Sequence, residues 1–257
     1  MCYEPDSRPP VAAGSESIAG AGHVTLRSAD GTAFTGNEAR AHSGDGTAML
    51  ILPDVRGLVP YYQELAVRFA EHGIDALAID YFGRTAPPAE GRPADFEYRD
   101  HVDRTTFADL RADVQAGAAH LRSDPNRRVE RLFTVGFCFG GRLSFLAATF
   151  GLELAGVIGL HAGLGPRNDL PIVADVASDI RAPVLGLFGG ADPSIPPEAV
   201  AAFDAALDGA GVEHRFVTYP GAPHSFFDRK YEEFAAQCAA AWDDLLAFVR
   251  APHATPA

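Results

Sequence analysis

The chemistry that this sequence offers is concentrated at Cys138, which stands in the segment Gly-Phe-Cys-Phe-Gly-Gly. A β-branched run precedes the segment and an apolar helical pattern follows it, which is the layout of a nucleophile elbow, G-x-Nuc-x-G. The nucleophile of such a turn has a strained backbone and needs small neighbours, a demand that Gly136 and Gly140 meet. The N-terminal end of the following helix favours the reactive thiolate. The alternative is a buried cysteine in a glycine-rich turn.

A cysteine nucleophile needs a base and a group that orients the base, and two later residues fit these roles. Asp192 follows an apolar run in Gly-Gly-Ala-Asp-Pro, and His224 follows the last β-type run in Pro-Gly-Ala-Pro-His. Each residue also has a structural alternative: Asp192 could be a turn-forming aspartate before a proline, and His224 could be a loop histidine, one of nine histidines in the chain. The order nucleophile, acid, histidine is that of the α/β-hydrolase fold, so the sequence favours a catalytic triad.

Alternating strand and helix patterns must position these residues. Alternating runs around Asp30-Gly31 predict a β-hairpin. Apolar runs predict strands at 47–52, 74–79, 132–137, 154–160, 183–188 and 216–219, and helices stand between them and after the last. This pattern predicts an α/β fold with a mainly parallel central sheet, helices on both faces and the N-terminal hairpin at the edge.

Ligand sites of parallel sheets lie beyond the C-terminal ends of the strands. Several polar residues follow such ends here, and the topology brings them to one rim: Asp54, Arg84, Cys138, His161, Asp192 and His224. The polar, proline-bearing stretch 85–104 has the length of a functional cover or a disordered loop.

Length and composition fit one domain of 257 residues. We expect a loosely ordered arm at 1–22, a single α/β-hydrolase domain at 23–250 and a tail at 251–257. The formal net charge of -13 argues against nucleic acid or an anionic membrane as partner. It does not exclude a small anionic substrate, since one arginine can dominate a pocket.

The three cysteines have neither metal-ligand spacing nor the even count of a disulfide framework. We therefore expect no metal, no cofactor and a cytoplasmic protein, since neither a signal peptide nor a transmembrane run is recognisable. Cys238 lies on the apolar face of the last helix pattern and fits a core residue. The sequence leaves monomer and homodimer open.

The chain resembles the dienelactone hydrolase family from about 47 to 249. The most specific matches are the elbow at 136–141 and the segment Pro-Gly-Ala-Pro-His-Ser-Phe at 220–226. The resemblance implies that Cys138 is the nucleophile, that His224 is the base and that Asp192 orients it. It also implies that the amides of Val55 and Phe139 form the oxyanion hole.

Further residues take roles through the same resemblance. Asp54 stands where the well-known members have a glutamate that contacts the resting thiol, and its alternative is a solvated loop carboxylate. Arg84 matches an arginine that binds the substrate carboxylate, against the alternative of a surface arginine. A second such arginine comes one position late, at Arg229. The resemblance also places three residues in the substrate pocket, namely Tyr81, Phe137 and His161, although a packed histidine is the simpler account of the last.

These residues predict acyl transfer from a small lactone or ester to water through an acyl-cysteine intermediate, with a preference for substrates that carry a carboxylate. Two alternatives remain. One is a general carboxylesterase with a broad apolar pocket, in which Arg84 faces solvent. The other is a ligand-binding protein without hydrolytic activity on the same fold.

Overall fold

The computed structural model describes residues 8–10, 17–93 and 95–253. Eight strands form one sheet: β1 (Ile18–Arg27), β2 (Ala33–Ala41), β3 (Thr47–Leu52), β4 (Asp75–Ile79), β5 (Arg131–Phe137), β6 (Gly156–Leu160), β7 (Val184–Gly189) and β8 (His214–Tyr219). The α-helices are α1 (Pro60–Ala70), α2 (Arg99–Asp103), α3 (Phe107–Leu121), α4 (Phe139–Ala147), α5 (Pro197–Ala210), α6 (Phe226–Arg229) and α7 (Ala235–Arg250), and two 3₁₀ segments are η1 (Tyr81–Arg84) and η2 (Val173–Asp179).

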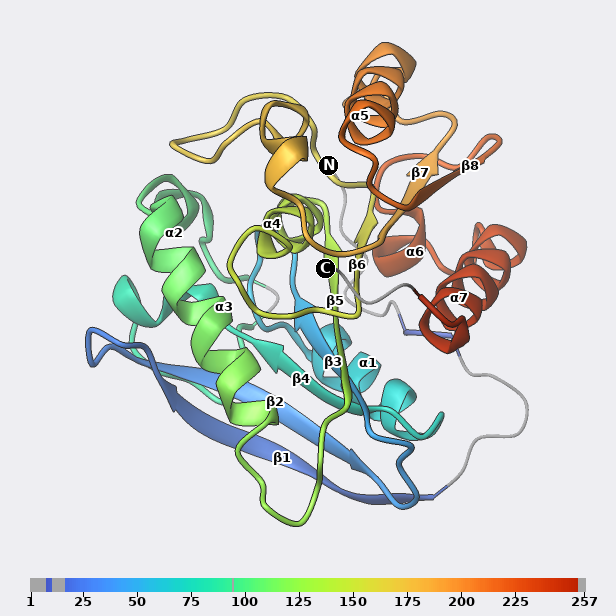
Figure 1. Ribbon diagram of the computed structural model, residues 1–257. Coiled ribbons are helices and arrows are strands. Elements are labelled where there is room, and N and C mark those ends of the chain that lie inside the picture. Colours follow the sequence, from blue (N-terminus) through green and yellow to red (C-terminus); the bar gives the residue numbers. More distant parts are fainter. Residues whose placement is uncertain (1–7, 11–16, 94, 254–257) are drawn as a thin grey trace.

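The strand order across the sheet is β1-β2-β4-β3-β5-β6-β7-β8 (Figure 1). Every neighbouring pair from β4 across β3 to β8 is parallel, whereas β2 is antiparallel both to β4 and to β1, with which it forms a hairpin at one edge. Gly31 turns this hairpin with a φ of 88°. The predicted mainly parallel sheet with an edge hairpin is therefore confirmed.

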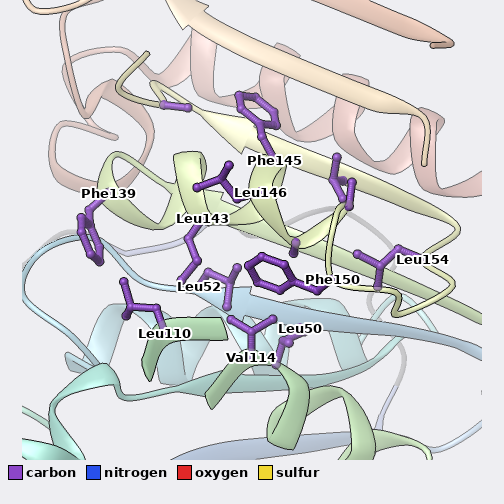
Figure 2. Packing of buried hydrophobic residues seen from close by; sticks show 14 of the residues in the cluster. Leu50, Leu52, Leu110, Val114, Phe139, Leu143, Phe145, Leu146, Phe150 and Leu154 are labelled. Atoms are coloured by element: carbon purple, nitrogen blue, oxygen red, sulfur yellow. The ribbon is translucent and has the colours of Figure 1, made fainter. Parts of the chain in front are cut away.

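Two apolar layers cover the sheet, one on each face. Along β3, alternate residues point to opposite sides, so that Leu50 and Leu52 join one layer and Met49 and Ile51 the other. Helices α3, α4 and α5 close the first layer, and α1 and α7 close the second. In Figure 2 the side chain of Leu143 on α4 lies between this helix and the sheet. The core thus fixes α4 directly above the central strands.

Two predictions about the segments need correction, and one short helix was not predicted. The stretch predicted as a long loop at 85–104 contains α2, and a short helix, α6, begins directly after Ser225. The expected loose arm at 1–22 overlaps β1, which begins at Ile18. Residues 1–7 and 11–16 of the arm and 254–257 of the tail lie outside the described residues. Among the described helices, none has the length and apolar character needed to cross a membrane.

Candidate active site

The turn between β5 and α4 holds Cys138 in a conformation that side chains rarely adopt, with φ 54° and ψ -106°. Two glycines make this turn sterically feasible. A Cβ atom on Gly136 would lie 1.9 Å from the carbonyl oxygen of Gly140. A Cβ atom on Gly140 would lie 2.1 Å from the carbonyl oxygen of Leu52. The glycines therefore allow the strained turn and let α4 begin in contact with the end of β3.

That contact places the turn after β3 beside the elbow, as the expected oxyanion hole requires. Phe139 is the first residue of α4, so its amide has no preceding helical carbonyl to bond. Among the described residues, the Val55 amide donates to no protein acceptor. The hydroxyl of Tyr81 donates to the carbonyl oxygen of Pro53 at 2.9 Å and fixes the start of this turn. Two amides without acceptors thus come from segments that the glycine contact brings together.

The loops after β7 and β8 bring Asp192 and His224 together. The amide of Ala191 donates to the carbonyl oxygen of Ala222 at 2.9 Å, which ties one loop to the other. Nδ1 of His224 then lies 2.6 Å from Oδ2 of Asp192. The other oxygen of Asp192 accepts from the amide and the hydroxyl of Ser194, at 2.8 and 2.6 Å. The carboxylate is therefore held by Ser194 while it orients the imidazole.

Electrostatics link His224 to Cys138 as well as to Asp192. Burial lowers the pKa of His224, but hydrogen bonding to Asp192 and Cys138 outweighs burial and raises it to about 10. Burial raises the pKa of Asp192, but its hydrogen bonds to His224 and Ser194 outweigh burial and hold the pKa of this carboxyl below its ordinary value. The Cys138 side chain is partly exposed. The arrangement favours a protonated imidazole beside an accessible sulfur, which is the state that a thiol nucleophile needs.

A buried polar cluster lies behind the imidazole of His224. Its centre is Asp228, whose carboxylate is fully buried and accepts from the Tyr62 hydroxyl at 2.9 Å and from Arg56 at 3.4 Å. Nε2 of His161 lies 3.2 Å from Oδ1 of Asp228 without hydrogen-bond alignment. The ring of His161 meets the ring of His224 edge-on at 5.0 Å. Burial raises the pKa of Asp228, but His161 and the arginines outweigh it and leave the pKa low.

Asp54 belongs to the same cluster. Its two oxygens accept from Nε of Arg56 at 2.9 and 2.8 Å, and Oδ2 also accepts from Arg229 at 2.6 Å. Burial raises the pKa of Asp54 to about 6 against the attraction of Arg229. Among the described residues no hydrogen bond joins Asp54 to Cys138. The alternative of a solvated loop carboxylate is wrong, because Asp54 is fully buried, and its partners are arginines.

Arg84, which was predicted to bind the substrate carboxylate, has several acidic partners within the protein. Its guanidinium pairs with Asp30 in the hairpin turn and with Asp113 of α3, at 2.9 Å for the latter. It also bonds the Thr32 hydroxyl at 2.8 Å, and Asp109 lies 3.4 Å away. The charge of Arg84 is therefore balanced by carboxylates of the chain itself. The structure gives it a role in joining the hairpin to α3.

The other predicted pocket residues also have partners within the protein. Phe137 is fully buried and packs against the rings of Tyr62 and Phe227. His161 is fully buried behind His224, and Tyr81 is almost fully buried with its hydroxyl at Pro53. The structure thus assigns Phe137, His161 and Tyr81 to the support of the site and not to its open surface.

Four residues of the site were missed in the sequence: Arg56, Tyr62, Ser194 and Asp228. Ser194 had a local signal, because an Asp-x-Ser pair closes a turn by a bond from the serine to the aspartate. The signal for Asp228 was weaker, since it follows two phenylalanines and breaks an apolar run. Among the described residues, one group has metal-ligand geometry: Asp204, Asp208 and His214. His214 begins β8, so this group lies at the far end of that strand from His224.

Known proteins resemble the chain over most of its length. The pattern of the family described as "Dienelactone hydrolase family" matches residues 33–252. A "Putative carboxymethylenebutenolidase" of Methylorubrum extorquens is 30% identical over 213 residues, which cover 80% of this chain and 72% of the relative. A "Probable 2-oxo-3-(5-oxofuran-2-ylidene)propanoate lactonase" of Bradyrhizobium is 27% identical and covers 79% of this chain and 83% of the relative. A crystal structure titled as a putative dienelactone hydrolase of Klebsiella pneumoniae has a TM-score of 0.77 at 27% identity, over 91% of this chain and 99% of that one.

Proposed function

The chain belongs to the dienelactone hydrolase family and is a carboxylic ester hydrolase, and we propose that it cleaves small lactones or esters with Cys138 as its nucleophile. The observation that carries this proposal is the joint geometry of the elbow and the imidazole. Cys138 sits in a strained turn at the start of α4, and His224 is bound to Asp192 at 2.6 Å. Cys138 is also among the groups that raise the pKa of His224, which supports a position of the thiol close to the imidazole.

In the first half of the reaction the Cys138 thiolate attacks the carbonyl carbon of the substrate. The new C–S bond converts the carbonyl oxygen to an oxyanion, which accepts hydrogen bonds from the amides of Val55 and Phe139. Collapse of this tetrahedral species breaks the C–O bond to the leaving group. The departing alkoxide or enolate takes the proton of the His224 imidazolium, and an acyl-cysteine remains.

In the second half, neutral His224 removes a proton from a water molecule, and the resulting hydroxide attacks the thioester carbonyl. The same two amides bind the second oxyanion, and its collapse expels the Cys138 thiolate and releases the carboxylic acid. Asp192 keeps the imidazole in the required orientation in both halves. His224 regains a proton in this step, so the starting ion pair is restored.

The thiol favours a particular class of substrate. Thiolate is itself a good leaving group, so attack on an ester with a poor leaving group tends to reverse before the C–O bond breaks. A lactone whose ring oxygen departs as an enolate avoids this reversal. The name of the Bradyrhizobium relative describes an oxofuran lactone that carries a propanoate group, and therefore a carboxylate. We therefore propose unsaturated lactones or activated esters, preferably acidic ones.

A second candidate is a general carboxylesterase without preference for acidic substrates. The pairing of Arg84 with Asp30 and Asp113 favours it, because the arginine expected to bind a carboxylate is occupied. Comparison of an acidic ester with its neutral analogue separates the two candidates.

The nucleophile is tested by hydrolysis of an unsaturated lactone and an aryl ester by wild type, Cys138→Ala and the matched control Cys238→Ala. We expect Cys138→Ala to lower kcat/KM by roughly 10³-fold or more, because it removes the group that forms the acyl intermediate. Cys238 is fully buried on α7, and its replacement should leave turnover in place. Intact-mass analysis of acid-quenched wild type should show one acyl adduct on the Cys138 peptide. Unchanged turnover in Cys138→Ala would overturn the mechanism.

A further inference from the structure

The two arginines that would bind a substrate carboxylate by family resemblance are both engaged by aspartates. Arg84 pairs with Asp30 and Asp113, and Arg229 pairs with Asp54 at 2.6 Å. A carboxylate bound at either place would compete with a carboxylate of the protein. An acidic substrate therefore requires another cation near Cys138.

Arg142 is a buried cation next to the elbow, one helical turn after Cys138. Its Nε donates to the carbonyl oxygen of Gly163 at 2.7 Å, and its Nη2 donates to the carbonyl oxygen of Gly165. Nη1 is buried without a hydrogen-bond partner, and only 5% of the residue is exposed. Among the described residues Arg142 forms no ion pair. Its charge thus lies inside the protein with no compensating carboxylate, which is unfavourable unless an anion approaches.

Arg167 supplies a second cation at the same rim, and this one is exposed. Its guanidinium carbon lies 6.0 Å from the centre of the Phe139 ring, the residue that follows the nucleophile. A tight turn holds Arg167 there, because its carbonyl oxygen accepts from the Leu170 amide at 3.1 Å. The side chain of Asn168 in this turn donates to the carbonyl oxygen of Val102 at 2.9 Å and anchors the turn to α2. Within the described part of the chain, Arg167 also has no ion-pair partner.

Arg142, Arg167 and the sulfur of Cys138 are close enough to influence one another electrostatically. Burial lowers the pKa of Arg142, repulsion by Arg167 lowers it further, and attraction by Cys138 raises it. Two guanidiniums that repel each other beside a reactive thiol form a site where an anion relieves an unfavourable charge arrangement.

We propose that Arg167, backed by the buried charge of Arg142, binds the carboxylate of the substrate at the rim of Phe139. The proposal rests on the proposed hydrolysis at Cys138 and adds the site that selects acidic lactones or esters. A guanidinium recognises a carboxylate through two parallel charge-assisted hydrogen bonds. The exposed Arg167 side chain can form these bonds, and the Arg142 charge strengthens the attraction from behind.

The experiment compares the 4-nitrophenyl monoester of succinic acid with its methyl-capped neutral analogue in wild type, Arg167→Gln and Arg111→Gln. Arg111 is the matched control, because it is also exposed and its guanidinium carbon lies 5.4 Å from the ring of Phe150. We expect wild type to prefer the acidic ester, and Arg167→Gln to lower the acidic-to-neutral ratio of kcat/KM roughly tenfold, as loss of a charge-assisted hydrogen bond predicts. The ratio should stay at its wild-type value in Arg111→Gln.

A second measurement does not depend on turnover. Iodoacetate and iodoacetamide alkylate the same sulfur and differ in charge, so the ratio of their rates at Cys138 reports the cations beside it. Arg167→Gln should lower the iodoacetate-to-iodoacetamide ratio several-fold relative to Arg111→Gln.

The two readouts separate the inference from the proposed function. Hydrolysis of both esters without any preference, or with a ratio that Arg167→Gln leaves unchanged, would overturn the carboxylate site and leave the hydrolase intact. Absence of hydrolysis with a lowered alkylation ratio would overturn the function and support the anion site. An alkylation ratio that Arg167→Gln does not change would overturn the anion site in either case.

Discussion

Replacing Asp192 by asparagine tests the electrostatics on which the proposed chemistry depends. Only 22% of the His224 side chain is exposed, and its Nδ1 lies 2.6 Å from Asp192. Burial lowers the pKa of His224, yet bonds to Asp192 and Cys138 raise it from 6.5 to about 10. At about 1.4 kcal/mol per pKa unit, this difference favours the protonated imidazole by roughly 5 kcal/mol.

We expect Asp192→Asn to lower the pKa of His224 by about one pKa unit or more, because the hydrogen bond to the Asp192 carboxylate is the largest of the contributions that raise it. Asp192→Asn also removes the group that holds the imidazole in the required tautomer and orientation, so kcat/KM should fall by about 10²-fold or more. NMR titration of the imidazole gives the pKa, and aryl-ester hydrolysis gives the rate.

Asp204→Asn is the matched control, because Asp204 lies 3.1 Å from Nε2 of His214 in a second aspartate–histidine pair. That pair is remote from Cys138, and its loss should leave the ester hydrolysis rate unchanged. The reasoning is refuted if His224 of the wild type titrates near 6.5. It is also refuted if Asp192→Asn moves the pKa of His224 by less than about half a pKa unit.

The same pKa predicts how stability depends on pH. Because the pKa of His224 is higher in the folded chain than its ordinary 6.5, the folded state holds a proton that the unfolded state loses between pH 6.5 and about 10. The stabilisation is complete below pH 6.5 and is lost as the pH rises towards 10, with a slope of up to about 1.4 kcal/mol per pH unit. Urea unfolding of wild type should therefore show a steeper fall over this interval than unfolding of His224→Gln.

Two further predictions concern the fold around the site. Gly136→Ala would place a Cβ atom 1.9 Å from the carbonyl oxygen of Gly140 and should lower the free energy of unfolding by about 3 kcal/mol or more. The control Gly209→Ala, on α5 with no atom within 4 Å, should raise it by about 0.5–1 kcal/mol, and equal urea midpoints would contradict the steric account. Arg84→Gln should destabilise the fold by about 3 kcal/mol, because it leaves Asp113, which is 1% exposed, without its cation. A variant of wild-type stability that has lost only its preference for acidic esters would restore the substrate-binding role that sequence predicts for Arg84.

The candidate triad could be proposed from sequence because its signals are local. A strand followed by a glycine-flanked cysteine, or by a proline-rich turn with a histidine, is visible in a short window. The α/β topology then carries Cys138, Asp192 and His224 to one rim, whatever the details of the packing. The hydrogen bond between Asp192 and His224 also depends on the backbone hydrogen bond from Ala191 to Ala222, which no local sequence pattern predicts.

The partners of the arginines were not predictable in this way. Arg84 follows a strand at the rim, and its position alone is compatible with substrate binding. The direction of the Arg84 side chain is set by its ion pair with Asp113. Asp113 lies on the buried face of α3, where a carboxylate is stabilised by a neighbouring cation. Burial raises the pKa of Asp113 to about 6, while Ser28 and Arg84 act against this rise. The pairing of Arg84 with Asp113 depends on which face of α3 packs against the hairpin, and only the assembled fold determines that face.

Asp54 and Arg229, the two positions at which this sequence differs from the expected family pattern, are direct partners in the structure. Successive residues of a helix differ by about 100° around its axis, so Asp228 and Arg229 of α6 point in different directions. Asp228 now faces Tyr62, while Arg229 reaches Asp54 at 2.6 Å. With Arg56 the cluster holds two carboxylates and two guanidiniums, so their formal charges cancel. Because Asp54 is held by Arg56 and Arg229, and because Cys138 is among the groups that raise the pKa of His224, we expect His224 and not Asp54 to stabilise the resting thiolate.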